Sequence, residues 1–206
     1  SNLESDHKYG VFEIGMSNKG EIKRLSSLVK PDIAIITNIG EAHIENFDNL
    51  NGIAEAKSEI IQNINKGGHL ILNRDDKYFN YLSNLAKKRK INVLSFGLAS
   101  KADAKLIKNK LYKNYNNLHF RVLNKNIYLK VKNINSLIIL NILSTLLTLH
   151  ILDLDLSKIV NFQNHFRLIE GRGKTYCVSR YKKKFQFIDE SYNANPSSVK
   201  NAIDNF

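Results

Sequence analysis

Short apolar runs alternate with amphipathic segments along residues 9–96 of this chain. The apolar runs occupy 9–14, 33–39, 69–72 and 92–96, and each has the composition of a buried strand. Between them, apolar residues recur at helical spacing over 21–29, 52–64 and 77–88. This alternation predicts an α/β fold with a mostly parallel sheet flanked by helices.

The pattern changes after Gly97. Segments 102–108, 118–122 and 126–131 predict antiparallel strands, and 136–149 and 156–166 predict helices. A glycine-flanked linker begins at residue 170, two further strands are expected over 175–180 and 185–189, and a helix opens at Pro196. We therefore expect one domain over 1–170, truncated at its N-terminal side, and the beginning of a second domain over 171–206, also truncated.

The formal charge of +12 raises the question of an anionic partner. The basic residues cluster at 87–90 and 180–184, and aromatic residues are not spaced among them as stacking platforms would be. We therefore expect no nucleic-acid partner, and an anionic small-molecule substrate explains the charge equally well. The apolar stretch 136–152 contains polar residues and predicts a buried helix, so no membrane insertion is expected. The single cysteine, Cys177, excludes an intramolecular disulfide and indicates a reducing compartment.

Several polar residues stand where an open parallel sheet binds its ligands, beyond the carboxyl ends of the strands. Asn38 and His43 follow the run 33–39, and Lys57 lies on the next expected helix. Glu13 interrupts the first apolar run, where a carboxylate needs either a cation or a solvent-facing position. For each residue a structural explanation also stands: a surface loop histidine, a solvated lysine, or strand alternation that turns Glu13 outward.

No segment has the spacing of a phosphate-binding or zinc-binding motif. Segment 171–175, Gly-Arg-Gly-Lys-Thr, lacks the glycine spacing of a phosphate loop and precedes a strand, so we do not read it as a nucleotide site. No cysteine and histidine cluster suggests zinc. Carboxylate, imidazole and phosphate oxygens would suit Mg²⁺ better.

The order of the motifs resembles that of the Mur ligases, ATP-dependent amide-forming enzymes of peptidoglycan synthesis. The resemblance rests on the following segments: Phe12-Glu13-Ile14-Gly15, Thr37-Asn38-Ile39-Gly40-Glu41-Ala42-His43, Ala56-Lys57-Ser58-Glu59, Leu72-Asn73-Arg74-Asp75-Asp76, Gly171-Arg172, and 189–196 (Asp-Glu-Ser-Tyr-Asn-Ala-Asn-Pro). Segments 15–22 and 189–196 are in the style of the branch that adds D-alanyl-D-alanine to UDP-N-acetylmuramoyl-tripeptide. The family resemblance implies an incomplete central domain with added antiparallel strands, then the start of a Rossmann-like C-terminal domain. Another Mur ligase branch and folylpolyglutamate synthase remain as alternatives.

The resemblance also implies roles for individual residues. Glu13 and His43 match magnesium-binding positions, and Lys57 matches a lysine that is carbamylated in many members. Asn38 is grouped with His43 and Lys57 as catalytic. Residues of the nucleotide site are implied at Asn141, Arg172 and Glu190. The implied cofactors are ATP and Mg²⁺, and the implied chemistry is formation of an acyl phosphate followed by attack of the dipeptide amine.

Three departures from the family pattern qualify these expectations. The phosphate loop and the UDP-binding domain are missing from the sequence, only Asn141 remains of the adenine motif on its helix, and Glu190 stands where the family usually has aspartate. A second hypothesis is therefore that the chain alone binds ATP poorly and is an inactive fragment or a scaffold. The intact protein is expected to be a monomer in the bacterial cytoplasm.

Overall fold

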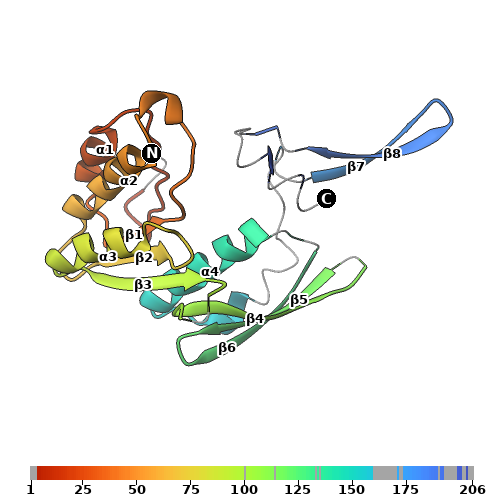
Figure 1. The fold of residues 1–206 in the computed structure, drawn as a ribbon. Coiled ribbons are helices and arrows are strands. Elements are labelled where there is room, and N and C mark those ends of the chain that lie inside the picture. The colour runs from red at the N-terminus through yellow and green to blue at the C-terminus, as the bar shows by residue number, and fades with distance from the viewer. Residues whose placement is uncertain are drawn as a thin grey trace. The chain divides into compact units, whose positions relative to one another are not determined.

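The computed structural model describes residues 4–99, 101–113, 115–132, 134, 136–159, 171, 174–189, 191–192, 199–200 and 203. The chain forms two compact units. The first comprises Ser1–Ile39, His43–Leu72 and Lys77–Leu94, and the second comprises Gly40–Ala42, Asn73–Asp76 and Ser95–Phe206. Figure 1 shows the helices and strands of each unit.

The first unit is built from parallel strands and short helices. Strand β1 (Ile33–Ile36) pairs in parallel with β2 (His69–Asn73), with Ile33 opposite His69 and Ile36 opposite Leu72. The helices are α1 (Glu21–Val29), η1 (Ile44–Asn46), α2 (Leu50–Ser58), η2 (Glu59–Asn63) and α3 (Phe79–Lys88). Strand β3 (Asn92–Gly97) begins in this unit.

Two apolar clusters hold the first unit together. One joins the inward side chains of β1 and β2, such as Ile36 and Leu72, to Leu82 and Ala86 of α3. The other joins Met16 and Ile22 to Ile53 and Ala56 of α2. Removal of these side chains from water supplies the main stabilisation, at about 25 cal/mol per Å² of apolar surface buried.

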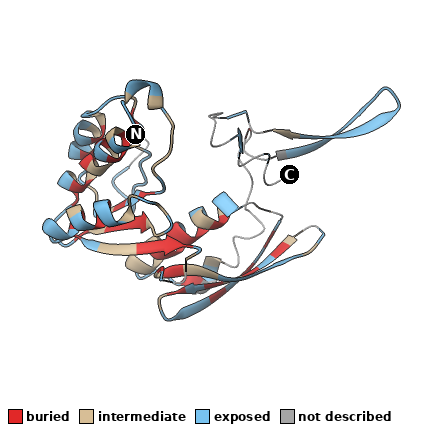
Figure 2. Cartoon of the chain, in the orientation of Figure 1, coloured by how far each residue is buried: buried red, intermediate tan, exposed pale blue. Residues whose placement is uncertain are grey.

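The second unit contains the antiparallel strands. The end of β3 pairs in parallel with β4 (Ala104–Leu111), which pairs antiparallel with β5 (Tyr115–Val122), and β5 pairs antiparallel with β6 (Lys125–Lys132). The hydrogen-bonded order is β1-β2-β3-β4-β5-β6. Helix α4 (Ser136–Ile151) packs against β4 and β5, and Figure 2 shows its buried residues. A short helix, η3 (Leu156–Lys158), and a separate hairpin of β7 (Lys174–Arg180) and β8 (Lys183–Asp189) follow.

The predicted class, a mostly parallel sheet with helices and added antiparallel strands, is confirmed. Differences concern the length of elements: the expected strand 33–39 ends at Ile36, and the expected helix 52–64 changes to 3₁₀ geometry at Glu59. Most of the helix expected over 156–166, and the start of the helix at Pro196, lie outside the described residues. Within the described part of the chain, no helix has the length and apolar character needed to cross a bilayer.

The prediction of a buried strand over 9–14 is wrong. This segment has no strand geometry, Val11 is 99 % exposed, and Tyr9 and Phe12 are also exposed. Only Ile14 reaches the apolar cluster around Ile53. An apolar run becomes a strand when a neighbouring segment takes up its backbone N–H and C=O groups, and no strand among the described residues pairs with this one.

Candidate active site

Helix α2 positions Lys57, and a side-chain cap fixes where this helix begins. Asn49 caps the helix, since its side-chain oxygen accepts hydrogen bonds from the backbone N–H groups of Asn51 (2.8 Å) and Gly52 (3.3 Å). The side chain of Phe47 packs against Gly52, where an added Cβ would lie 3.3 Å from the ring. Ile53 and Ala56 face the core. Lys57 then stands in the last turn of α2 and is only partly exposed.

The loop after β1 packs onto the same helix. Ile39, Ile44 and Phe47, all from this loop, contact the cluster that contains Ile53 and Ala56. The loop therefore has apolar contacts on both sides of His43 and is not a free surface segment. These contacts bring the end of β1 and the end of α2 to one place in the first unit.

The two elements meet at Asn38 and Lys57. The ammonium group of Lys57 donates a hydrogen bond of 2.8 Å to the backbone carbonyl oxygen of Asn38. The Asn38 side chain is exposed. Two residues predicted from separate motifs thus share one position just beyond the carboxyl end of β1, where parallel sheets bind ligands.

His43 occupies a special backbone position in that loop. Its φ of 61° and ψ of 26° are left-handed, and it forms the N-cap of η1. Its Nδ1 atom lies 3.9 Å from a carboxylate oxygen of Glu45, and its side chain is 47 % exposed. The left-handed conformation is unfavourable for a residue with a side chain, so the packed loop must hold it in place.

The structure gives Glu13 no contact with these groups. Glu13 is exposed, and among the described residues it has no hydrogen bond or ion pair. In the same described ranges, no three histidine, cysteine, aspartate or glutamate side chains group as metal ligands would. The unmodified Lys57 ammonium is a cation that would repel a metal ion. The donor set therefore fits Mg²⁺ only if Lys57 is converted to an anion and Glu13 approaches His43.

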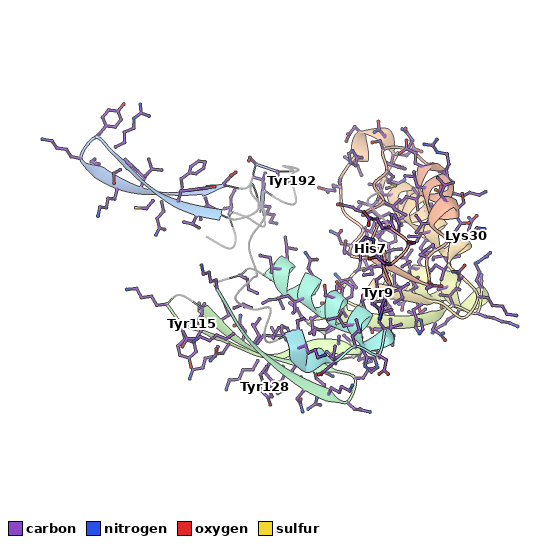
Figure 3. The ribbon with its side chains drawn as sticks, turned by 180° about the vertical axis from the view of Figure 1, so that it is seen from behind. His7, Tyr9, Lys30, Tyr115, Tyr128 and Tyr192 are labelled. Carbon is purple, nitrogen blue, oxygen red and sulfur yellow. The ribbon has the colours of Figure 1, made fainter. Side chains whose placement is uncertain are left out.

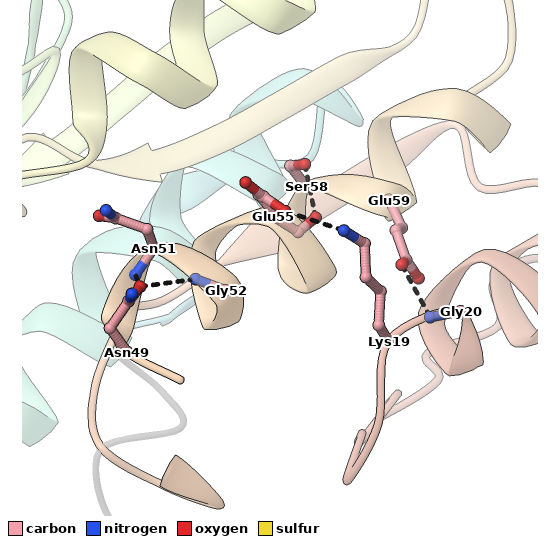
Figure 4. Close-up of polar contacts among 8 residues, drawn as sticks. All are labelled: Lys19, Gly20, Asn49, Asn51, Gly52, Glu55, Ser58 and Glu59. Atoms are coloured by element: carbon pink, nitrogen blue, oxygen red, sulfur yellow. Dashed lines mark hydrogen bonds and ion pairs between the residues drawn. The ribbon is translucent and has the colours of Figure 1, made fainter. Parts of the chain in front are cut away.

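A buried carboxylate with no role predicted from the sequence lies at the end of α2. Glu59 is 7 % exposed, and it accepts hydrogen bonds from the backbone N–H groups of Gly20 (2.8 Å) and Lys23 (3.0 Å). Gly20 is the N-cap of α1 and has no side chain to serve as acceptor, so Glu59 caps this helix from elsewhere in the chain. Nearby, Lys19 pairs with Glu55 at 2.9 Å, and this hydrogen bond raises the pKa of Lys19 (Figure 4).

The segment Asn73–Asp76 has a structural role in the second unit. Both carboxylate oxygens of Asp75 accept backbone hydrogen bonds, from Leu98 (2.6 Å) and Ala99 (3.0 Å). The Arg74 N–H donates to the carbonyl of Phe96 at 2.7 Å. This motif thus fixes the loop that follows β3.

The motif that begins at Gly171 and the motif at 189–196 are joined by a backbone hydrogen bond. The backbone N–H of Tyr192 donates to the carbonyl of Gly171 at 3.1 Å, and Gly171 has a φ of 77°. A Cβ at Gly171 would lie 2.7 Å from the Tyr192 nitrogen, so glycine is required there. Arg172 and Glu190 themselves lie outside the described residues, while the Asn141 side chain is exposed on α4.

An open depression of about 760 Å³ lies elsewhere on the first unit. Its lining includes Lys19, Lys23, Tyr81 and Arg89 and contains none of the predicted site residues. The site residues predicted from the sequence therefore do not line this depression.

Comparison with known proteins identifies the scaffold. The sequence profile described as the Mur ligase middle domain matches residues 1–149. The chain belongs to the Mur ligase middle-domain family. A UDP-N-acetylmuramoyl-tripeptide–D-alanyl-D-alanine ligase from Rickettsia prowazekii is 36 % identical to it over 205 residues, which are 99 % of this chain and 45 % of the relative.

Solved structures of this family agree with the fold. A crystal structure of MurF from Acinetobacter baumannii superposes with a TM-score of 0.86 at 27 % identity, over 98 % of this chain and 43 % of the other. MurF from Thermotoga maritima in complex with ADP gives a TM-score of 0.77 at 25 % identity, over 91 % of this chain and 42 % of the other. The chain thus spans less than half the length of these relatives.

Proposed function

We propose that this chain is the central part of an ATP-dependent ligase that adds D-alanyl-D-alanine to UDP-N-acetylmuramoyl-tripeptide in peptidoglycan synthesis. The observation that supports it most strongly is 36 % identity to a ligase of this name over nearly the whole chain. The proposed location is the bacterial cytoplasm, and the proposed substrates are ATP, the UDP-linked tripeptide and the dipeptide.

The proposed reaction has two stages. The tripeptide carboxylate attacks the γ-phosphorus of ATP, which forms an acyl phosphate and releases ADP. The dipeptide amine then attacks the acyl carbon, the C–O bond to phosphate breaks, and the ammonium proton is lost to water or to a nearby base. Both stages need charge neutralisation and accurate positioning more than covalent catalysis by the protein.

In this proposal the loop after β1 and the end of α2 form the working surface. The contact between Lys57 and Asn38 supports it, because it fixes the lysine beside the carboxyl end of a parallel strand. Addition of CO₂ to the neutral Lys57 amine, with loss of one proton, would give a carbamate. Glu13, His43 and this carbamate would then hold Mg²⁺, which supplies charge neutralisation for the ATP phosphates.

Residues that follow β6 in the chain supply the nucleotide contacts in the proposal. Asn141 would lie near the adenine, and Arg172 and Glu190 would contact ATP. The ADP complex of the Thermotoga maritima relative supports nucleotide binding by this scaffold. The meeting of Gly171 and Tyr192 supports a shared location for the two motifs that flank these residues.

A chimera tests the proposal, because the relative supplies the segments that this chain does not match. The 205-residue stretch of the Rickettsia prowazekii ligase that aligns with this chain would be replaced by this chain. ADP release would be measured with the UDP-tripeptide and three amines: D-alanyl-D-alanine, D-glutamate and diaminopimelate. The proposal predicts that, of the three amines, only D-alanyl-D-alanine supports ADP release. ADP release with D-glutamate or diaminopimelate but not with the dipeptide would contradict it.

The alternative, an inactive fragment with little ATP binding, concerns the 206-residue chain by itself. Calorimetric titration with ATP and Mg²⁺ separates the two cases. Micromolar binding would exclude the alternative, whereas its absence together with an active chimera would show that binding needs segments from the relative.

A further inference from the structure

One face of the antiparallel sheet in the second unit has an unusual charge. Along β5, the buried residues Leu118, Phe120 and Val122 alternate with residues on the opposite side. Residues directly opposite one another on antiparallel strands point to the same side of a sheet. The register therefore assigns six basic residues to the side away from the core: Lys105, Lys108, Lys110, Arg121, Lys130 and Lys132. We call this side the outer face.

The three strands themselves contain no aspartate or glutamate. The sequence contains no aspartate or glutamate between Asp103 and Asp153, although acidic residues are common in the rest of the chain. On most protein surfaces both signs of charge are interspersed. Strands lie about 4.8 Å apart and rise about 3.3 Å per residue, so the charges lie within a Debye length, about 8 Å, of their neighbours and act together on a partner.

Aromatic residues stand among these cations. Tyr112 and Tyr115 stack with their ring centres 4.6 Å apart, and His119 stacks on Tyr128 at 4.5 Å. Lys110 lies over the Tyr112 ring at 5.1 Å, and Lys130 lies over the Tyr115 ring at 4.1 Å. Figure 3 shows Tyr115 and Tyr128 on the sheet, on its side away from α4.

This arrangement distinguishes between two kinds of polyanion. Single-stranded nucleic acids bind aromatic platforms through free ring faces. Here the two ring pairs stack on one another, and Lys110 and Lys130 lie over Tyr112 and Tyr115, so the face offers a partner more cations than open ring faces. Such cations, spread over a sheet surface, match phosphates that lie in a plane. Tyrosine is also enriched where proteins meet the lipid headgroups.

We propose that the outer face of β4, β5 and β6 binds the surface of an anionic phospholipid membrane, without insertion. The lysine and arginine side chains contact the lipid phosphates, and the tyrosine hydroxyls donate hydrogen bonds to them. This inference does not depend on the proposed ligase activity.

Vesicle flotation of the 206-residue chain tests the proposal. The chain should float with vesicles in which roughly one lipid in three is phosphatidylglycerol, should not float with pure phosphatidylcholine vesicles, and should be released by high salt. The variant Lys108→Gln, Lys110→Gln, Arg121→Gln should bind about a hundred-fold more weakly, since each basic residue contributes roughly five-fold. Thermal unfolding of each variant checks that it folds.

A matched control removes the same charge from the first unit. The variant Lys66→Gln, Lys87→Gln, Lys88→Gln loses three exposed lysines that do not lie on the outer face. It should bind the anionic vesicles within about two-fold of the original chain. Equal losses in both triple variants would overturn the proposal, because net charge alone would then explain binding. Binding to a single-stranded oligonucleotide but not to vesicles, or to neither, would also overturn it.

Discussion

The Lys57 ammonium nitrogen lies 2.8 Å from the backbone carbonyl oxygen of Asn38, which is nineteen residues earlier in the chain. This hydrogen bond joins the last turn of α2 to the loop that leaves β1. The loop is also held by apolar contacts, because Ile39, Ile44 and Phe47 pack against the cluster that contains core residues of α2. The hydrogen bond to Asn38 holds the lysine beside the carboxyl end of β1.

Replacement of Lys57 in the chimeric ligase should greatly lower its turnover. Lys57→Ala removes the amine and should lower kcat by at least about a hundred-fold, a usual loss for a preorganised electrostatic group. Lys57→Arg should fail as well, because a guanidinium stays protonated and cannot form a carbamate. Steady-state ADP release measures both, with Lys66→Ala as the control at an exposed lysine. Near-normal turnover in Lys57→Arg would contradict the proposed role.

Gly68 is expected to tolerate no side chain. A Cβ there would lie 2.6 Å from the Asp32 carbonyl oxygen, 2.7 Å from the Ile64 side chain and 2.9 Å from the Asn65 carbonyl oxygen. Two of these neighbours are backbone atoms and cannot easily move. Gly68→Ala should therefore cost about 2 kcal/mol or more of unfolding free energy. Urea denaturation would measure this loss. The control is Gly15→Ala, because an added Cβ at Gly15 would have no atom within 4 Å. This control should change the unfolding free energy by less than about 0.5 kcal/mol.

The cap that Glu59 provides for α1 should also be measurable. Glutamine keeps one acceptor oxygen, but its amide group would face the second backbone N–H without a hydrogen bond. Glu59→Gln should therefore lower the unfolding free energy by about 2 kcal/mol. Glu55→Gln, which breaks the exposed contact with Lys19, is the matched control and should cost clearly less. Equal effects of the two substitutions would show that Glu59 does not cap the helix.

Glu21 should make a pH-dependent contribution to stability. The backbone N–H of Ser17 and then the side chain of Asn18 donate to its carboxylate and lower the pKa of Glu21. A lowered pKa stabilises the fold above the usual glutamate value of about 4.3, and this contribution is lost as the pH falls through the lower folded value. The melting temperature of Glu21→Gln should thus lie below that of the original chain at neutral pH, with the difference fading in acid. A constant difference at all pH values would argue against this account.

Sequence patterns were sufficient where local chemistry decides the structure. The β-branched run at Ile33–Ile36 and the alternating pattern of β5 and β6 each carry their own signal. The antiparallel arrangement after Gly97 was also predicted correctly. In these elements propensity and burial favour the same conformation.

The failures concern relationships between distant segments. The run 9–14 has strand composition, but pairing requires a partner that composition cannot identify. Glu59 stands out in the sequence only as the last residue of a motif, because the N-cap Gly20, from whose N–H it accepts a hydrogen bond, lies 39 residues away. The outer face was missed for a similar reason: its cations are scattered along the sequence and gather only when three strands align.

The most direct test of the central claim is the mass of the product that the chimeric ligase forms. The enzyme would be incubated with ATP, UDP-N-acetylmuramoyl-tripeptide and an equimolar mixture of D-alanyl-D-alanine, D-glutamate and diaminopimelate. The account predicts a single UDP-linked pentapeptide, heavier than the tripeptide by the dipeptide less one water. A product that carries either of the other amines would contradict it.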